Sequence, residues 1–182
     1  MGLDMYAARK LYVTQWEFES PDERYSVQVE RGGKPVSGIQ SDRISAIEEE
    51  VMYWRKANHI HAWFVDNVQN GEDNGREYLV DWDKLRELLS ACTKVIEAST
   101  LVGGMVYAGE TWNPEKHEWV TQREPGKLIE DPTVAKQLLP TRAGFFFGSM
   151  EYDEDYLNDV VKTRDWAAQM LKDHENGVPG DI

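Results

Sequence analysis

Residues 53–64 read YWRKANHIHAWF, and they occupy the middle of a longer apolar stripe. Large residues recur along 44–68 at alternating spacings of three and four, which is typical of one face of an α-helix. Ser41-Asp42 would cap its start, and polar turns at 70–71 and 74–75 would follow its end. We therefore expect one long amphipathic helix, whose stripe contains Ile44, Ile47, Val51, Trp54, Asn58, His61, Val65 and Val68.

Two polar residues, Asn58 and His61, interrupt this apolar stripe. A polar group on a buried face is costly unless it is hydrogen-bonded. One interpretation is a polar pocket whose floor is made by Arg55, Asn58 and His61. The other, which we favour, is a buried pair hydrogen-bonded to backbone groups of the N-terminal strand or of the loop at Phe145.

Shorter patterns elsewhere predict strands and turns. Alternation of Leu3, Met5 and Ala7 with polar neighbours predicts a first strand over 2–14, bent near Arg9-Lys10. Residues 144–148 are either a buried strand or a loop that fills the core. The other predicted β-elements are a hairpin over 24–39 turning at Gly32-Gly33, a short strand at 78–80, a hairpin within 101–120 and a turn at 124–126.

Three further helices are expected. Asp81 or Asp83 caps one whose buried face includes Leu85 and Cys92, so this cysteine is expected to be an inert core residue. Asp131-Pro132 starts a short second helix, and the last runs over about 153–173. The predicted fold is α+β, a single domain over 1–182 with a candidate hairpin insertion at about 101–129. Its small, mostly antiparallel sheet packs against two long central helices and a C-terminal helix.

The chain is strongly acidic, with 33 Asp and Glu against 20 Lys and Arg and a net charge of −13. Such a surface repels nucleic acid and anionic membranes, and it attracts a basic partner. Solubility alone explains the charge equally well. Five acids between 150 and 160 are accompanied by no base. They are Glu151, Asp153, Glu154, Asp155 and Asp159.

This acidic run has two interpretations of equal weight. Carboxylates in the first turn of a helix interact favourably with its dipole. Alternatively, the run is an anionic surface that competes for the phosphate-binding Arg and Lys residues of a partner. On the second interpretation the expected partner-binding residues are Glu48, Glu49, Glu151, Asp153, Glu154, Asp155 and Asp159.

Several classes of function lack their usual signals. His59 and His61 lie two apart, which on a helix points them in different directions, so neither metal nor cofactor is expected. A Gly-rich phosphate loop and a Gly-x-Ser-x-Gly elbow are absent from the sequence. The single cysteine, the lack of a secretory signal and the lack of an apolar span favour a cytoplasmic protein. We expect a binding protein and not an enzyme.

Trp112 and Trp119 flank a charged part of the expected second hairpin. Tryptophan is enriched among the residues that dominate protein–protein interfaces, so both are candidate anchors. Core packing is nevertheless the favoured prediction for Trp119.

Three blocks of the sequence resemble a family of small proteins from phages and mobile elements. The stretch 101–129 matches none of them. The blocks are GLDMY at 2–6, EVMYWRKAN with IH and WF over 50–64, and LPT with GFFFGS and EYD over 139–153.

Size, acidity and this origin are also similar to the anti-CRISPR proteins that inhibit type II RNA-guided nucleases. The resemblance implies a protein in the bacterial host cytoplasm that binds the nuclease–guide RNA complex and blocks DNA binding or cleavage. Such a nuclease holds DNA in an Arg/Lys-rich channel that an acidic protein can occupy. Specific binding of nucleic acid by this chain itself is not expected.

Two alternatives stay open. One is a phage-encoded protein that binds a small nucleotide signal in a pocket near Arg55, Asn58 and His61. The other is an enzyme that uses His61 as a general base.

Overall fold

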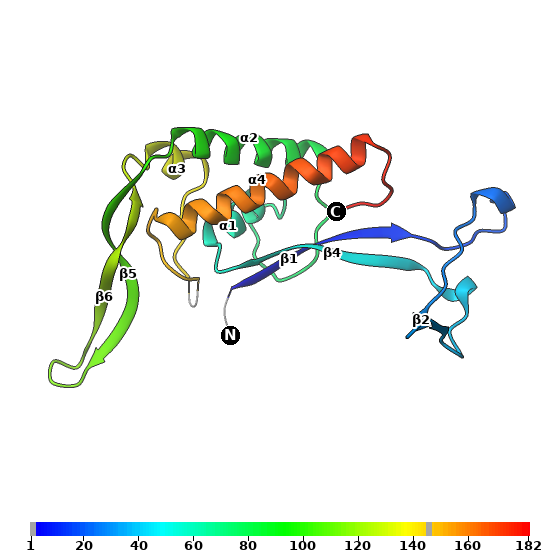
Figure 1. Ribbon diagram of the computed structural model, residues 1–182, viewed down its shortest axis with the longest axis horizontal. Coiled ribbons are helices and arrows are strands. Elements are labelled where there is room, and N and C mark those ends of the chain that lie inside the picture. Colours follow the sequence, from blue (N-terminus) through cyan, green and yellow to red (C-terminus); the bar gives the residue numbers. More distant parts are fainter. Residues whose placement is uncertain (1–2, 145–146) are drawn as a thin grey trace.

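The computed structural model describes residues 3–144 and 147–182, and it has an α+β architecture. Within those residues lie four α-helices and three small antiparallel sheets of two strands each. The helices form a central body, and β-ribbons extend from it toward both ends of the long axis (Figure 1). The predicted fold class is therefore confirmed.

The first ribbon pairs β1 (Asp4–Tyr12) with β4 (Ala46–Arg55). A bulge between Ala7 and Ala8 bends it, close to the bend predicted at Arg9-Lys10. Opposite charges face each other across the strands. Arg9 donates to the Glu49 carboxylate at 2.5 Å, and it also reaches Asp173 at 3.2 Å. Such cross-strand pairs help to fix the register of a two-stranded ribbon.

The long helix expected over 41–68 is wrong in its first half. Residues 46–55 form β4, and the helix α1 (Asn58–Asn67) begins only after a break. Lys56 has a φ of 61°, outside the helical region, and the Asn58 N–H donates back to the Lys56 carbonyl at 2.8 Å. The first half is rich in β-branched and aromatic residues, and pairing with β1 outweighs the helical spacing.

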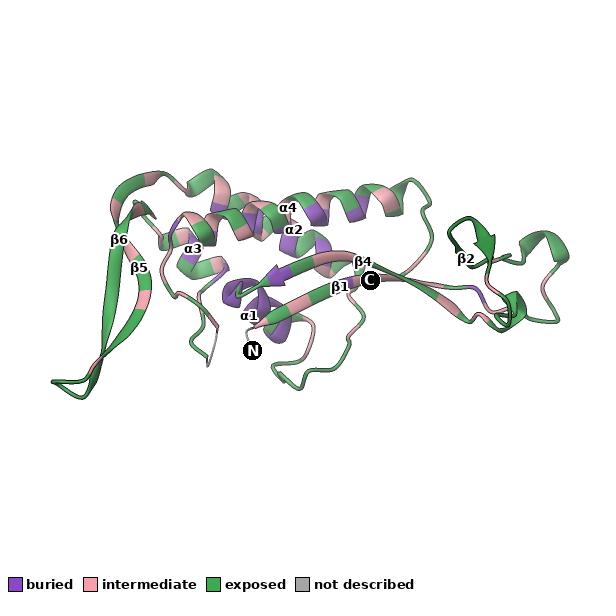
Figure 2. Ribbon diagram, turned by 60° about the horizontal axis from the view of Figure 1, so that its bottom comes forward, coloured by how far each residue is buried: buried purple, intermediate pink, exposed green. Residues whose placement is uncertain are grey.

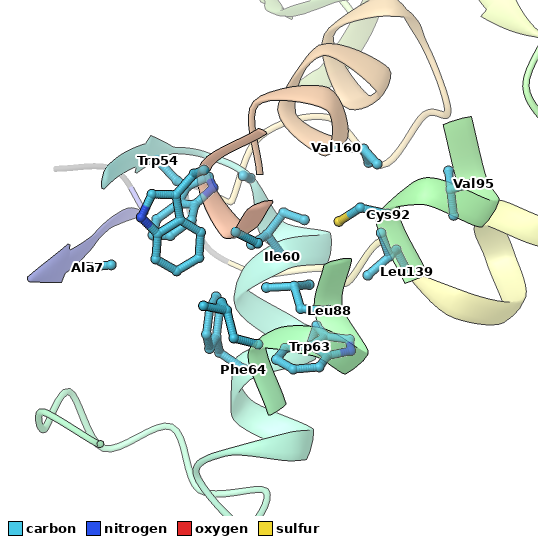
Figure 3. Close-up of a cluster of buried hydrophobic side chains, with 14 of the residues drawn as sticks. Ala7, Trp54, Ile60, Trp63, Phe64, Leu88, Cys92, Val95, Leu139 and Val160 are labelled. Atoms are coloured by element: carbon cyan, nitrogen blue, oxygen red, sulfur yellow. The ribbon is translucent and has the colours of Figure 1, made fainter. Parts of the chain in front are cut away.

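The core lies between α2 (Trp82–Ala98), α4 (Glu154–Glu175), α1 and the inner half of the first ribbon (Figure 3). Trp54 connects these layers. Its Nε1 donates to Thr163 Oγ1 at 2.8 Å, and its ring lies edge-on to Trp166 at 5.1 Å. Cys92 is fully buried, as predicted, and burial raises the pKa of its thiol to about 12. The structure thus has one long central helix, α2, where two were predicted.

The second ribbon pairs β5 (Leu101–Asn113) with β6 (Glu118–Ile129) and stands away from the body. The predicted second hairpin is confirmed and is longer than expected. The turn expected at 124–126 is wrong, because these residues pair with 104–106 inside the ribbon. Pro125, which has no N–H to donate, is accommodated here because both strands of a two-stranded ribbon are edge strands.

The remaining elements are short. The predicted hairpin over 24–39 is confirmed in its centre as β2 (Glu30–Arg31) and β3 (Lys34–Pro35), with positive φ at Gly32 and Gly33. The strand expected at 78–80 does not form, and the Val80 N–H donates to the Ile182 carbonyl instead. The other short elements are the 3₁₀ turns Pro21–Glu23 and Ser41–Arg43 and the helix α3 (Thr133–Leu138).

The outer parts of the molecule are much less buried than the helical body (Figure 2). Part of the segment expected to fill the core, at 145–146, lies outside the described residues. None of the helices in the described chain is long and apolar enough to cross a lipid bilayer.

Candidate functional site

A cleft of about 520 Å³ opens where four segments meet. These segments are the β4–α1 junction, residues 107–109 of β5, the loop at 148–153 and the first turns of α4. The cleft contains the predicted pocket residues Arg55 and Asn58 together with four of the predicted acidic residues. Those four are Glu151, Asp153, Asp155 and Asp159. Two residues of the predicted polar pocket and four of the predicted acidic residues therefore lie in the same cleft, although the sequence predicted the two groups separately.

The β4–α1 junction supplies the cationic wall of the cleft. Arg55 and Lys56 are both exposed, and Lys56 adopts a left-handed backbone conformation. Gly148 packs against this residue, and a Cβ added to Gly148 would lie 3.0 Å from the Lys56 Cβ. Gly148 also has a φ of 89°, which side chains rarely adopt. The close approach and the backbone angle both explain a glycine here.

Asn58 holds the loop that forms the floor of the cleft. Its Nδ2 donates to the Phe147 and Ser149 carbonyls at 3.1 and 2.8 Å, and its Oδ1 accepts from the Arg142 N–H at 3.0 Å. These three bonds occupy both donor hydrogens and the acceptor oxygen of the amide. The arrangement agrees with the favoured structural interpretation of Asn58, and it leaves little capacity for a ligand.

His61 is separated from the other two predicted pocket residues and does not belong to the described lining of the cleft. Its Nε2 lies 3.6 Å from the Asp73 carboxylate, and its ring lies edge-on to Phe147. His59 does line the cleft, and its ring lies tilted against that of Tyr156, with the centroids 4.2 Å apart. Burial lowers the pKa of His59 to about 3, so this imidazole is neutral at physiological pH.

Asp153 is the one buried carboxylate of the acidic run, and Asp159 is half-buried. Asp153 caps α4, at the predicted start of the last helix, by accepting a hydrogen bond from the Tyr156 N–H at 2.9 Å. Burial raises the pKa of Asp153, and it raises the pKa of Asp159 to about 6. The nearby positive charge of Lys162 partly opposes the rise at Asp159. Asp153 thus has a structural role at the start of α4, whereas the first-turn carboxylates to which the helix-dipole interpretation applies are Glu154 and Asp155.

Glu151 and Glu154 attach the second ribbon to the body. Glu151 accepts from the Tyr107 N–H at 2.9 Å and from the Arg123 guanidinium at 2.5 Å. Glu154 accepts from Lys127 at 2.7 Å. Both carboxylates are therefore engaged within the chain, although both remain partly accessible to solvent.

The structure does not bring Glu48 and Glu49 to the cleft. They lie in β4 seven and six residues before Arg55, which corresponds to roughly 20 Å along an extended strand. Glu49 pairs with Arg9, and Glu48 is exposed opposite Lys10. The predicted partner-binding residues therefore form two separate groups.

The cleft combines charges of both signs. Four carboxylates face three cations, Arg55, Lys56 and Lys162. Such a site can form ion pairs with charged side chains of a partner. In the described part of the chain, no group of three or more His, Cys, Asp or Glu side chains is arranged to hold a metal ion.

Sequence reasoning missed several residues at this site and elsewhere. Tyr107 and Lys162 line the cleft, but their places depend on the position of the ribbon and on the rotation of α4. Core packing of Trp119 is wrong, because this side chain is 64% exposed near the tip of the second ribbon. The feature of the sequence that could have predicted this exposure is the position of Trp119 close to Trp112 in a stretch with several charged residues.

Comparison with protein-family models, with curated proteins and with solved structures found no match to this chain.

Proposed function

We propose that this chain is an inhibitor that binds a type II RNA-guided DNA nuclease carrying its guide and blocks DNA binding or cleavage. The observation that carries the proposal is the excess of unpaired carboxylates. Within the described residues, ten of the 33 acidic side chains lie within 4.0 Å of a basic group. Most of the negative charge is thus available to a partner.

The physical basis is competition for a basic surface. An RNA-guided nuclease holds nucleic acid in a positively charged channel. A protein with a net charge of −13 is attracted to that channel, and the attraction accelerates their encounter. The same charge opposes binding of nucleic acid by the inhibitor itself. The sequence resemblance supplies the choice of nuclease.

The predicted contact residues differ in how free they are. Glu49, Glu151 and Glu154 form ion pairs within the chain, and Asp153 caps a helix. Glu48, Asp155 and Asp159 form none of the described ion pairs. Loss of these three charges should therefore weaken binding with the least disturbance of the fold.

A DNA cleavage assay tests the function directly. Purified nuclease, guide RNA and target DNA are titrated with this protein, which is added before or after the DNA. We expect cleavage to stop near one inhibitor per nuclease, and the order of addition identifies the blocked step. Undiminished cleavage across several nuclease orthologues would contradict the proposal.

A pair of charge variants tests the mechanism. The variant E48Q/D155N/D159N should inhibit less and should show a weaker dependence on salt. The control E17Q/D22N/D42N removes the same number of charges from exposed positions at the far end of the first ribbon. Equal loss of inhibition in the two variants would show that only net charge matters.

The nucleotide-binding alternative has less support from the geometry. The four carboxylates of the cleft repel phosphate groups, and the amide of Asn58 is already hydrogen-bonded. A rise in melting temperature with cyclic or adenine nucleotides would favour this alternative over the inhibitor. In the enzyme alternative, His61 is the general base. An H61A variant that folds and keeps the full activity of the unmodified chain would contradict this alternative.

A further inference from the structure

The tip of the β5–β6 hairpin carries an exposed pair of tryptophans. Trp112 and Trp119 are direct cross-strand partners, 44% and 64% exposed, with ring centroids 5.5 Å apart in an edge-on arrangement. The only other aromatic group near them in the described chain is His117, 6.4 Å from the Trp112 ring. A protruding hairpin with two large exposed indoles is unusual, because each could bury much apolar area.

The attachment of the hairpin leaves this pair free. Position 119 is an even number of residues from Arg123, Lys127 and Ile129, so these side chains share one face of the twisting strand β6. At the base, Ile129 is buried, and the two basic residues pair with Glu151 and Glu154. The contacts with the body thus reach the middle of the ribbon, at Tyr107 and Arg123, and the tip with the two tryptophans extends beyond them (Figure 1).

A hollow of about 390 Å³ lies at the hairpin tip, and of the two tryptophans Trp112 lines it. Trp112, Pro114 and Val120 contribute apolar surface to it, and Glu115 contributes a carboxylate. An exposed aromatic anchor next to a concavity is the arrangement that interface hot spots commonly use.

The charge at the tip specifies the partner. Glu110, Glu115 and Glu118 belong to the same segment 110–120 as the tryptophans, whereas Lys116 is the one Lys or Arg in that segment and lies 4.0 Å from Glu118. A guanidinium group stacks on indole rings and pairs with carboxylates at the same time. Phosphate groups would be repelled here.

We infer that the hairpin tip, through Trp112 and Trp119, docks an arginine-bearing segment of a partner protein. The inference rests on the proposed function for its general choice of a basic protein partner. It adds the element that makes the contact and the side chain that is recognised. The tryptophans stack on the guanidinium, and the surrounding glutamates neutralise it.

A matched pair of variants isolates the tip. The variant W112S/W119S removes the aromatic pair at exposed positions, so it should remain folded. The control W16S/F18S removes another exposed pair, 54% and 84% accessible and stacked at 6.1 Å, from the opposite end of the molecule. Circular dichroism of all three proteins checks their folding.

The probe is a fluorescent peptide of alternating arginine and leucine, whose anisotropy is followed at 150 mM salt. We expect W112S/W119S to bind it about 10-fold more weakly than the unmodified chain, and the control to bind within about twofold. A peptide with citrulline in place of arginine should also bind weakly. Equal binding by W112S/W119S and the unmodified chain would overturn the inference.

The nuclease assay separates this inference from the proposed function. If the unmodified chain and W112S/W119S inhibit cleavage equally, the inhibitor stands and the docking role of the tip fails. If the unmodified chain does not inhibit but the peptide series behaves as expected, the choice of nuclease fails and the tip remains the docking site. Tryptophan-dependent binding of a 20-nucleotide single-stranded DNA would overturn the protein partner, since bases also stack on indoles.

Discussion

The two β-ribbons of this molecule have the same construction and different surroundings. Each pairs two antiparallel strands, and each contains one bulge. The β1–β4 ribbon buries Ala7 and Trp54 against the helices, and the segment at Asp181 adds a bridge to its edge at Lys10. Along β5 and β6, Ile129 is the one buried residue.

The difference lies in the contacts that attach each ribbon. The first is attached through apolar packing and a buried hydrogen bond, whose loss is costly. The second is attached at its base by the buried Ile129 and by a backbone bridge between Leu128 and Asp153. Farther along, it is attached by ion pairs near the surface, which contribute little to stability. A ribbon that the fold hardly needs can carry exposed aromatic residues for a partner. We therefore assign stability to the first ribbon and recognition to the second.

The strongest test of this comparison replaces one tryptophan in each ribbon. Trp54→Ala should lower the free energy of unfolding by about 3–5 kcal/mol, because it leaves a cavity beside Trp166 and removes the partner of Thr163. Trp119→Ala should change it by less than about 0.5 kcal/mol, because the side chain is exposed. Urea denaturation measures both, and similar losses would contradict the assignment.

The Asn58 amide provides the second test, since it secures the loop that leads to the anchor Glu151. Asn58→Ala should cost roughly 2–3 kcal/mol, because a buried side chain and its three partly buried hydrogen bonds to the loop backbone are lost. The control is Asn67→Ala on the same helix. Asn67 is exposed and makes a single bond, to the Trp63 carbonyl, so its loss should cost well under 1 kcal/mol. Equal losses would mean that the loop does not depend on Asn58.

The sequence was sufficient where local chemistry determines the structure. The start of the last helix near Asp153 and the turn at Gly32-Gly33 were both predicted, because each depends on a few adjacent residues. It was insufficient at residues 46–55, where spacings of three and four fit a helix. The partner strand β1, about 40 residues earlier in the chain, determines the outcome there, and no local pattern reports it.

The candidate site was predictable in part for the same reason. Arg55, Asn58 and the acidic run were identified as unusual, yet their meeting in one cleft depends on how α4 packs near the β4–α1 junction. His61 was grouped with Asn58 through the helical spacing of three. That spacing holds in α1, but it does not place both side chains at the cleft.

The third test concerns Asp159, which lies in the cleft near the base of the second ribbon. Because burial raises its pKa to about 6, the folded chain keeps a proton that the unfolded chain releases above about pH 4. Stability should therefore fall as pH rises from about 4 to about 7. The free energy of unfolding of D159N should be compared with that of the unmodified chain at each pH. After allowance for partial exposure, this difference should favour D159N by about 1–2 kcal/mol more at pH 7.5 than at pH 4.5.

Denaturation at the two pH values measures this difference. The variant E97Q, at an exposed position near the end of α2, controls for the loss of one negative charge. If D159N and E97Q follow the same pH dependence, the carboxyl of Asp159 is not kept protonated by the fold.

The smallest expected effect on stability belongs to the ion pairs that attach the second ribbon. R123Q/K127Q should lower the free energy of unfolding by less than about 1 kcal/mol, since both basic groups are largely exposed. It should nevertheless broaden the distribution of distances between spin labels at positions 115 and 175, because the ribbon loses its ion pairs with α4 and with the loop before it. The buried thiol of Cys92 will not compete for the label.

The variant K84Q/R86Q, which removes two surface ion pairs of α2, should leave the distribution unchanged. An unchanged distance distribution in R123Q/K127Q would mean that the backbone at the ribbon base alone sets the direction of the ribbon. A loss of several kcal/mol in the free energy of unfolding would mean that the second ribbon contributes to stability as the first does.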